Sequence, residues 1–98
     1  GVSPEMLHRV AKLDSYLRRT LRLQPTYTSG LRDETKNQVV GGALHSLHLQ
    51  GRAVDLVVSG ITVAQEALVV QFANQQGLGA LWHGIGDNYH LHLQLTDE

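Results

Sequence analysis

Hydrophobic positions in the first quarter of the chain recur at helical spacing. Between residues 4 and 22 the apolar side chains that repeat at this spacing are Met6, Val10, Leu13, Leu17 and Leu21. Side chains three or four residues apart share one side of an α-helix. Ser3 is a suitable N-cap, Pro4 suits the first helical position, and Pro25 is expected to end the segment. The pattern predicts an amphipathic helix over residues 4–22 that packs against a core.

Short apolar runs separated by turn residues follow in the second half of the chain. They predict strands over residues 26–29, 53–58, 80–85 and 89–95, and a helix over residues 63–76. Thr62 and Gln65 form a capping box for this helix, and Gly77 suits its C-terminal end. The turn Gly86-Asp87-Asn88 makes the last two strands antiparallel. The order of elements predicts the α+β class.

The middle of the chain, residues 31–51, carries little long-range periodicity. The stretch from Asp33 to Val39 fits a short helix closed by Gly41 and Gly42. About 20 residues without regular structure are unusual in a compact domain and often carry function. The next strand, over residues 53–58, is apolar almost throughout, which predicts a central place in the sheet.

Composition and charge exclude several classes of protein. A chain of 98 residues is expected to form one small domain, residues 1–98, and it has no cysteine for disulfides, thiol catalysis or zinc clusters. No apolar run approaches the roughly 18 residues of a membrane span. The formal net charge of −1 argues against a nucleic-acid-binding polycation. Arg18, Arg19 and Arg22 lie near the predicted end of the first helix, where the helix dipole favours cations.

Four of the six histidines form two close pairs, His45 with His48 and His90 with His92. Side chains alternate between the faces of a strand, so His90, His92 and Gln94 share one face. Leu91, Leu93 and Leu95 share the other face and are expected to point into the core. His83 either closes over the histidine face from the turn or is simply an exposed turn residue.

Asp55 is a carboxylate within an apolar strand, where burial is costly unless the group is paired or bound to a metal. His48 lies at the end of the loop that precedes this strand. His48, Asp55 and His92 together supply two imidazoles and one carboxylate. This ligand set suits a catalytic zinc with an open position. Ordinary surface or core histidines and an ion pair between Asp55 and Arg52 also fit. The patterns alone leave both interpretations open.

One long motif resembles a known family. Residues 46–55 read Ser-x-His-x-x-Gly-x-Ala-x-Asp and are followed later by His90-Leu91-His92. With Ser29-Gly30-Leu31-Arg32 before them, they resemble the zinc D-Ala-D-Ala carboxypeptidases of the M15 peptidase family. The wider group includes lysostaphin-type enzymes and the hedgehog signalling domain. The resemblance covers residues 28–95.

The resemblance implies a fold and a metal site. The fold is a small antiparallel sheet that carries a zinc site and packs against helices. One Zn²⁺ ion would be held by His48, Asp55 and His92. His90 would assist proton transfer or stabilise the oxyanion. Tyr89 stands where many members carry a glutamate that acts as general base, and Gln94 stands where relatives often have an acid.

The resemblance also implies a substrate. Arg32 would act in catalysis by holding the terminal carboxylate of the substrate, for which a guanidinium fork is well suited. Ser46 would hydrogen-bond the substrate or a ligand, and Tyr89 is a further candidate for substrate binding. The expected reaction is hydrolysis of a peptidoglycan stem peptide or another small peptide, in a periplasmic, extracellular or phage-associated setting. The alternative is a zinc-stabilised, non-catalytic binding module of hedgehog type.

Overall fold

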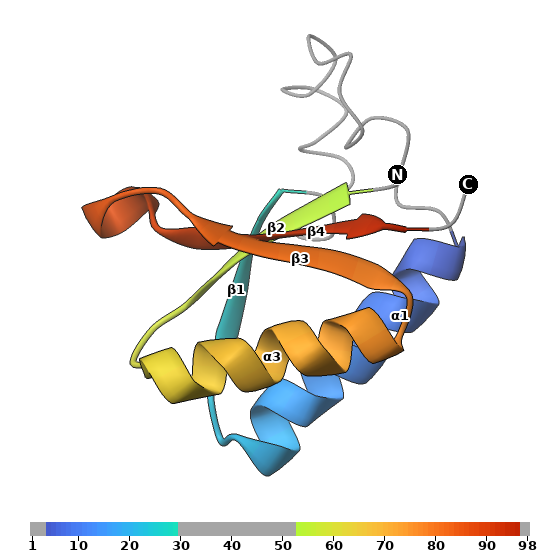
Figure 1. Ribbon diagram of the computed structural model, residues 1–98, viewed down its shortest axis with the longest axis horizontal. Helices are drawn as coiled ribbons and strands as arrows, with labels where there is room; N and C mark the ends of the chain where they lie inside the picture. Colours follow the sequence, from blue (N-terminus) through green and yellow to red (C-terminus); the bar gives the residue numbers. More distant parts are fainter. Residues whose placement is uncertain (1–3, 30–52, 97–98) are drawn as a thin grey trace, which may run out of the picture.

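The computed structural model describes residues 4–29 and 53–96 (Figure 1). The elements in chain order are α1 (Pro4–Ser15), the π-helical turn η1 (Tyr16–Thr20), β1 (Pro25–Ser29), β2 (Ala53–Val58), α3 (Val63–Gln75), β3 (Leu78–His83), the 3₁₀ turn η3 (Gly86–Asn88) and β4 (His90–Leu95). The predicted N-cap Ser3 and the short helix predicted from Asp33 to Val39 lie outside the described residues.

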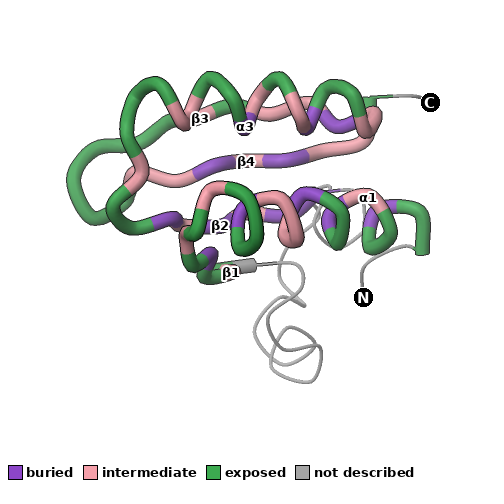
Figure 2. The backbone as a smooth tube through the Cα atoms, turned by 90° about the horizontal axis from the view of Figure 1, so that it is seen from below, coloured by how far each residue is buried: buried purple, intermediate pink, exposed green. Residues whose placement is uncertain are grey.

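The strands in the described part of the chain form one antiparallel sheet in the order β1-β2-β4-β3. Helices α1 and α3 lie side by side on the same face of this sheet (Figures 1 and 2). β2 and β4 are the two inner strands, which confirms the predicted central place of residues 53–58. The architecture agrees with the predicted α+β class.

The core lies between the sheet and the two helices. Leu91 and Leu93 of β4 are fully buried, and they pack with Met6 and Leu13 of α1 and Val69 of α3. Along β4, buried residues alternate with half-buried ones (Figure 2). This alternation confirms that these two leucines point into the core while the intervening positions face away from the helices.

The first helix ends differently from the prediction. It is α-helical only to Ser15 and continues as a π-helical turn to Thr20. Arg22 then takes a left-handed conformation with φ of 60°, and the Leu23 N–H donates to the Leu17 carbonyl at 2.9 Å. These two features turn the chain out of the helix. Pro25 does not end the helix but begins β1.

The third strand is displaced by two residues from the predicted range 80–85. β3 starts at Leu78 and ends at His83, where it stays paired with β4 up to His90. Gly84 has φ of 107°, and a Cβ there would collide with the carbonyl of Asn88. The chain leaves the sheet at this glycine because the tight turn needs a residue without a side chain.

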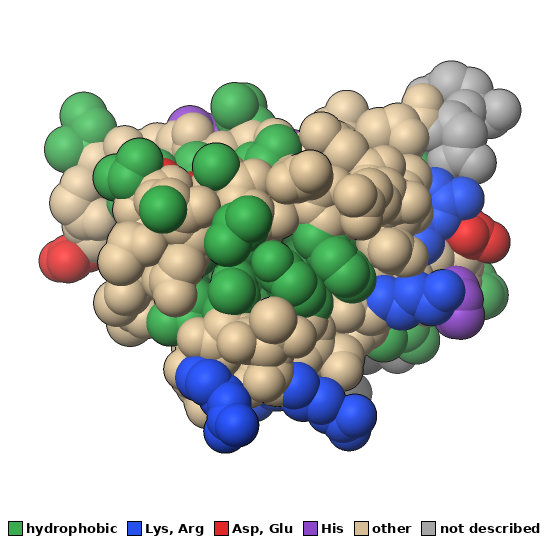
Figure 3. Space-filling view, turned by 60° about the horizontal axis from the view of Figure 1, so that its bottom comes forward, with side chains coloured by type: hydrophobic (Ala, Val, Ile, Leu, Met, Phe, Trp, Pro, Cys, Tyr) green, Lys and Arg blue, Asp and Glu red, His purple; other side chains and the backbone are tan. Residues whose placement is uncertain are grey.

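The cations of the first helical segment lie on the helical side of the molecule. Figure 3 shows hydrophobic side chains gathered in the middle of this side, with Lys and Arg along its lower and right edges. Arg9 pairs with Glu5 at 2.7 Å and Arg18 with Asp14 at 2.9 Å. No helix in the described residues is long and apolar enough to cross a membrane.

The capping box at the start of α3 is confirmed and gives a testable stability effect. The Gln65 N–H donates to Thr62 Oγ1 at 3.1 Å, and the Thr62 N–H donates to Gln65 Oε1 at 3.0 Å. Thr62→Ala removes the side-chain acceptor, so we expect the free energy of unfolding in urea to fall by about 1 kcal/mol. Thr20→Ala, at the exposed last residue of η1, is the control. Equal losses in both variants would contradict the assignment.

Candidate metal and catalytic site

The face of the sheet opposite the helices carries the three histidines of β3 and β4. Residues directly opposite each other in an antiparallel pair point to the same face. Asp55 of β2 lies opposite His92 of β4, and His83 of β3 lies opposite His90. Three neighbouring strands therefore bring one carboxylate and three imidazoles together on a single surface.

Asp55 and His92 are in direct contact. Oδ1 of Asp55 and Nδ1 of His92 are 2.8 Å apart, and Nε2 of His92 lies 2.9 Å from Oε1 of Gln94. The side chains of Asp55 and His92 are 22% and 24% exposed, so a small ligand can reach them. The structure thus brings together two of the three predicted zinc ligands and fixes the ring of one of them.

The chemistry and spacing of this pair fit a tetrahedral zinc ion. Carboxylate oxygen and imidazole nitrogen are ordinary zinc ligands, and at bond lengths of about 2.0–2.1 Å two of them lie about 3.3 Å apart. The observed separation of 2.8 Å is a hydrogen bond, so zinc binding between these two atoms would need the Nδ1 proton to leave and the atoms to move apart by about 0.5 Å. Within residues 4–29 and 53–96 no group of three His, Cys, Asp or Glu could hold a metal. The third predicted ligand, His48, lies outside the described residues, as do Arg32 and Ser46.

His90 is the neighbouring imidazole on the same face. Its Nδ1 lies 2.6 Å from the carbonyl oxygen of Asn88. A carbonyl only accepts a hydrogen bond, so Nδ1 carries the hydrogen and Nε2 of the neutral ring keeps its lone pair. Among the described residues Nε2 has no hydrogen-bond partner. His90 therefore presents a basic nitrogen beside the Asp55–His92 pair.

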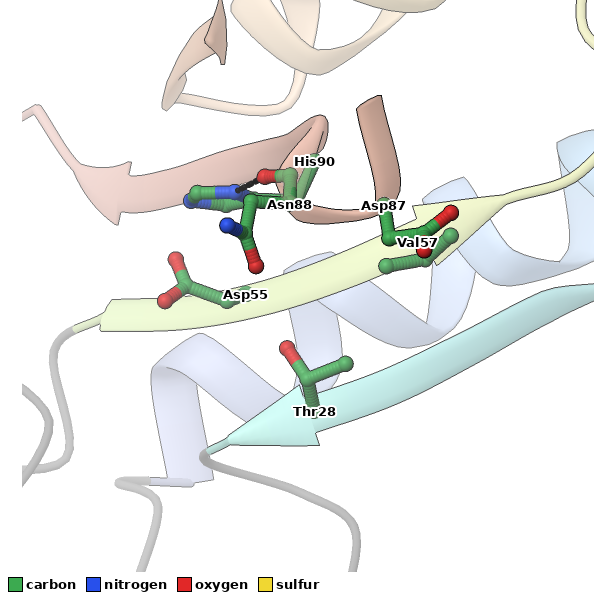
Figure 4. Close-up of a pocket in the computed structure, with 6 residues that line it drawn as sticks. All are labelled: Thr28, Asp55, Val57, Asp87, Asn88 and His90. Atoms are coloured by element: carbon green, nitrogen blue, oxygen red, sulfur yellow. Dashed lines mark hydrogen bonds between the residues drawn. The ribbon is translucent and has the colours of Figure 1, made fainter. Parts of the chain in front are cut away.

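A small hollow adjoins His90 on the side of β1 and β2 (Figure 4). Its volume is about 160 Å³, and it is lined by Thr28, Asp55, Val57, Asp87, Asn88 and His90. The Asn88 side chain and the Asp55 carboxylate point toward one another across it (Figure 4). Ordinary small-molecule pockets measure roughly 300–1,000 Å³. The described residues alone thus enclose room for one small substituent of a ligand.

Tyr89, predicted to bind substrate, lies on the opposite face from His90 and His92. Its hydroxyl donates to Oε1 of Glu66 in α3 at 3.0 Å, and its ring stacks on Trp82 with centroids 5.7 Å apart. Burial and the Glu66 carboxylate raise the pKa of Tyr89. The alternation that places Leu91 in the core places residue 89 on the same side, so the sequence already carried this signal.

Sequence patterns did not identify the partner of His90, because the Asn88 carbonyl that orients it is set by the turn. The Gln94 amide lies beside His92, in agreement with the predicted shared face of the two residues on β4. His83 was predicted as either a closing residue or an exposed one. It is exposed, yet its ring contacts His90, with centroids 4.2 Å apart. Sequence periodicity does not predict that contact, because it depends on the register in which β3 pairs with β4.

Comparison with known protein families identifies the family of this chain. The family model described as Peptidase M15 matches residues 2–94, almost the whole chain. No curated protein and no solved structure matches the chain. M15 peptidases are generally zinc-dependent enzymes. The match over residues 2–94 shows that the chain belongs to the M15 peptidase family.

Proposed function

We propose that this protein is a zinc-dependent peptidase that hydrolyses peptidoglycan stem peptides, as a carboxypeptidase or an endopeptidase. The observation that carries the proposal is the Asp55–His92 contact together with His90 on the same face, whose Nε2 has no hydrogen-bond partner among the residues that the structure describes. A ligand pair next to a base is the arrangement that metal-assisted hydrolysis needs.

One zinc ion would be held by His48, Asp55 and His92. When bound, zinc supplies Lewis-acid chemistry: it polarises a carbonyl and makes water nucleophilic near neutral pH. The hydrogen bond between Asp55 and His92 supports this assignment, because both side chains are already oriented toward one point on the sheet face. His92 is further oriented by Gln94, as the outer partners of metal ligands commonly do.

His90 would move the proton of the reaction. Its Nε2 takes a proton from the attacking water as the new C–O bond forms. The same nitrogen then gives the proton to the leaving amine when the peptide C–N bond breaks. Tyr89 takes no part, because its hydroxyl is bonded to Glu66 on the other face.

Arg32 would hold the free carboxylate of the substrate through a two-point hydrogen bond, and Ser46 would add a hydrogen bond to the substrate or to a ligand. The hollow beside His90 has room for a small substituent such as the methyl group of alanine. With this substrate class, we expect the protein in the bacterial envelope, outside the cell, or on a phage particle. No nucleic acid is expected as a partner.

A non-catalytic zinc module of hedgehog type is the second candidate. Tyr89 stands where many family members have a glutamate base, and the structure commits its hydroxyl to Glu66. This feature favours the second candidate. The basic Nε2 of His90, on the same face as Asp55 and His92, favours the enzyme, since a binding module has no need of it.

Incubation with purified peptidoglycan and its stem peptides tests the proposal. We expect new products in the mass spectrum that disappear when a zinc chelator is added and return when zinc is restored, because the chelator removes the Lewis acid. The product masses identify the cleaved bond. If the folded, zinc-loaded protein yields no products, the proposed peptidase activity is overturned and the binding module is favoured.

A further inference from the structure

His83 is an exposed imidazole without an evident structural task. It is the last residue of β3, directly opposite His90 on β4. Within the part of the chain that the structure describes, its nitrogens have no hydrogen-bond partner. Its ring contacts two others: its centroid lies 4.2 Å from that of His90 and 6.4 Å from that of His92.

Within residues 4–29 and 53–96, one hydrogen bond orients the ring of His90. Nδ1 donates to the Asn88 carbonyl, two residues earlier in the chain. One hydrogen bond to a main-chain oxygen does not by itself stop a half-buried imidazole from changing rotamer. The His83 ring, tilted by 60° against that of His90, occupies space beside it that another rotamer would use.

The turn between the two strands brings both of these contacts to His90. Gly84 allows the chain to pass so close to Asn88 that a Cβ would collide with the carbonyl of that residue. This is the same carbonyl that accepts from His90. The turn therefore sets the hydrogen bond on one edge of the ring, and the strand register sets His83 against another part of it.

We propose that His83 is a positioning residue for His90. By packing against the imidazole, it keeps Nδ1 on the Asn88 carbonyl and leaves Nε2 available on the face that carries Asp55 and His92. The packing is a property of this chain, whereas its consequence for turnover rests on the proposed peptidase function. The role needs the size and flatness of the side chain and not its nitrogens.

Two substitutions separate packing from imidazole chemistry. His83→Ala removes the ring, and His83→Phe keeps a flat ring without nitrogens. His8→Ala, at an exposed position on α1, is the matched control for loss of a histidine. The three variants and the parent protein, all zinc-loaded, are compared by long-range ¹⁵N–¹H NMR of the His90 ring at one alkaline pH, and by steady-state kinetics on a stem peptide.

We expect His83→Ala to mix the two tautomers of His90 and to lower kcat about tenfold with KM nearly unchanged, since small misplacements of a reacting group cost up to about 10²-fold. His83→Phe should restore both the single tautomer and kcat. His8→Ala should match the parent. These results would support positioning through packing.

Other outcomes overturn the proposal in distinguishable ways. An unchanged His90 spectrum in His83→Ala removes the positioning role. A His83→Phe protein as impaired as His83→Ala points to imidazole chemistry, and a lower zinc content in both points to metal binding by His83. If the parent protein hydrolyses no peptide, the NMR comparison still decides the packing, and only the proposed function fails.

Discussion

Asp55→Asn is expected to lower kcat/KM on a stem peptide by at least about 10³-fold, equivalent to about 4 kcal/mol of transition-state stabilisation. Zinc content should fall well below one ion per chain. The amide keeps the shape of the carboxylate but loses its charge, so it is a poor zinc ligand. It also replaces the charged partner of His92, which lies 2.8 Å away. Metal analysis and kinetics on the same preparation measure both effects.

Asp87→Asn is the matched control. Asp87 lines the same hollow as Asp55, but it is exposed in the η3 turn and is not among the predicted ligands. The same chemical change there should leave zinc content intact and kcat/KM within about threefold. Equal losses in the two variants would contradict a specific role for Asp55. Full zinc content in Asp55→Asn would remove this residue from the ligand set.

Leu93→Ala is expected to cause the largest loss of stability. Leu93 is fully buried on β4, between the sheet and the helices. Truncation of a buried leucine costs about 2–5 kcal/mol, because apolar contacts are lost and a cavity remains. A domain of this size has a total stability of only roughly 5–15 kcal/mol. Urea unfolding of the metal-free protein should show a loss of about 3 kcal/mol.

Leu81→Ala provides the comparison for that variant. Leu81 lies on the neighbouring strand β3, faces the histidine side, and is 59% exposed. The same truncation there should change the free energy of unfolding by less than about 0.5 kcal/mol. Similar losses at the two positions would mean that the histidine side is buried to the same extent as the helical side, contrary to the structure.

Local sequence patterns predicted most elements, because turn or capping residues mark the ends of each. The apolar run of β2 is bounded by Ser59 and Gly60, and its predicted range is the observed one. The capping box fixed the start of α3. The predicted range of β3 was displaced because residues 78–85 are mostly apolar and do not mark the ends of the strand. The observed end is set by pairing with β4 and by the turn at Gly84. Such limits come from contacts distant in sequence.

The candidate site was likewise predicted only in part. Alternation along β4 placed His90 and His92 on one face, and the structure adds Asp55 to them through the pairing of β2 with β4. Tyr89 was assigned to the site against that same alternation, and it lies with the leucines. The contact between His83 and His90 depends on a register that the sequence does not display. His48, Arg32 and Ser46 remain predictions.

β4 carries hydrophobic core on one face and histidines on the other, which links errors of folding to loss of function. Side chains along a strand alternate with a period of two, so a slip of one residue against β2 would exchange the two faces completely. Leu91 and Leu93 would then face water, while His90 and His92 would be forced against the helices. No intermediate arrangement keeps one face correct and the other wrong. Specific activity, measured per folded molecule, would therefore report whether β4 is paired with β2 in the correct register.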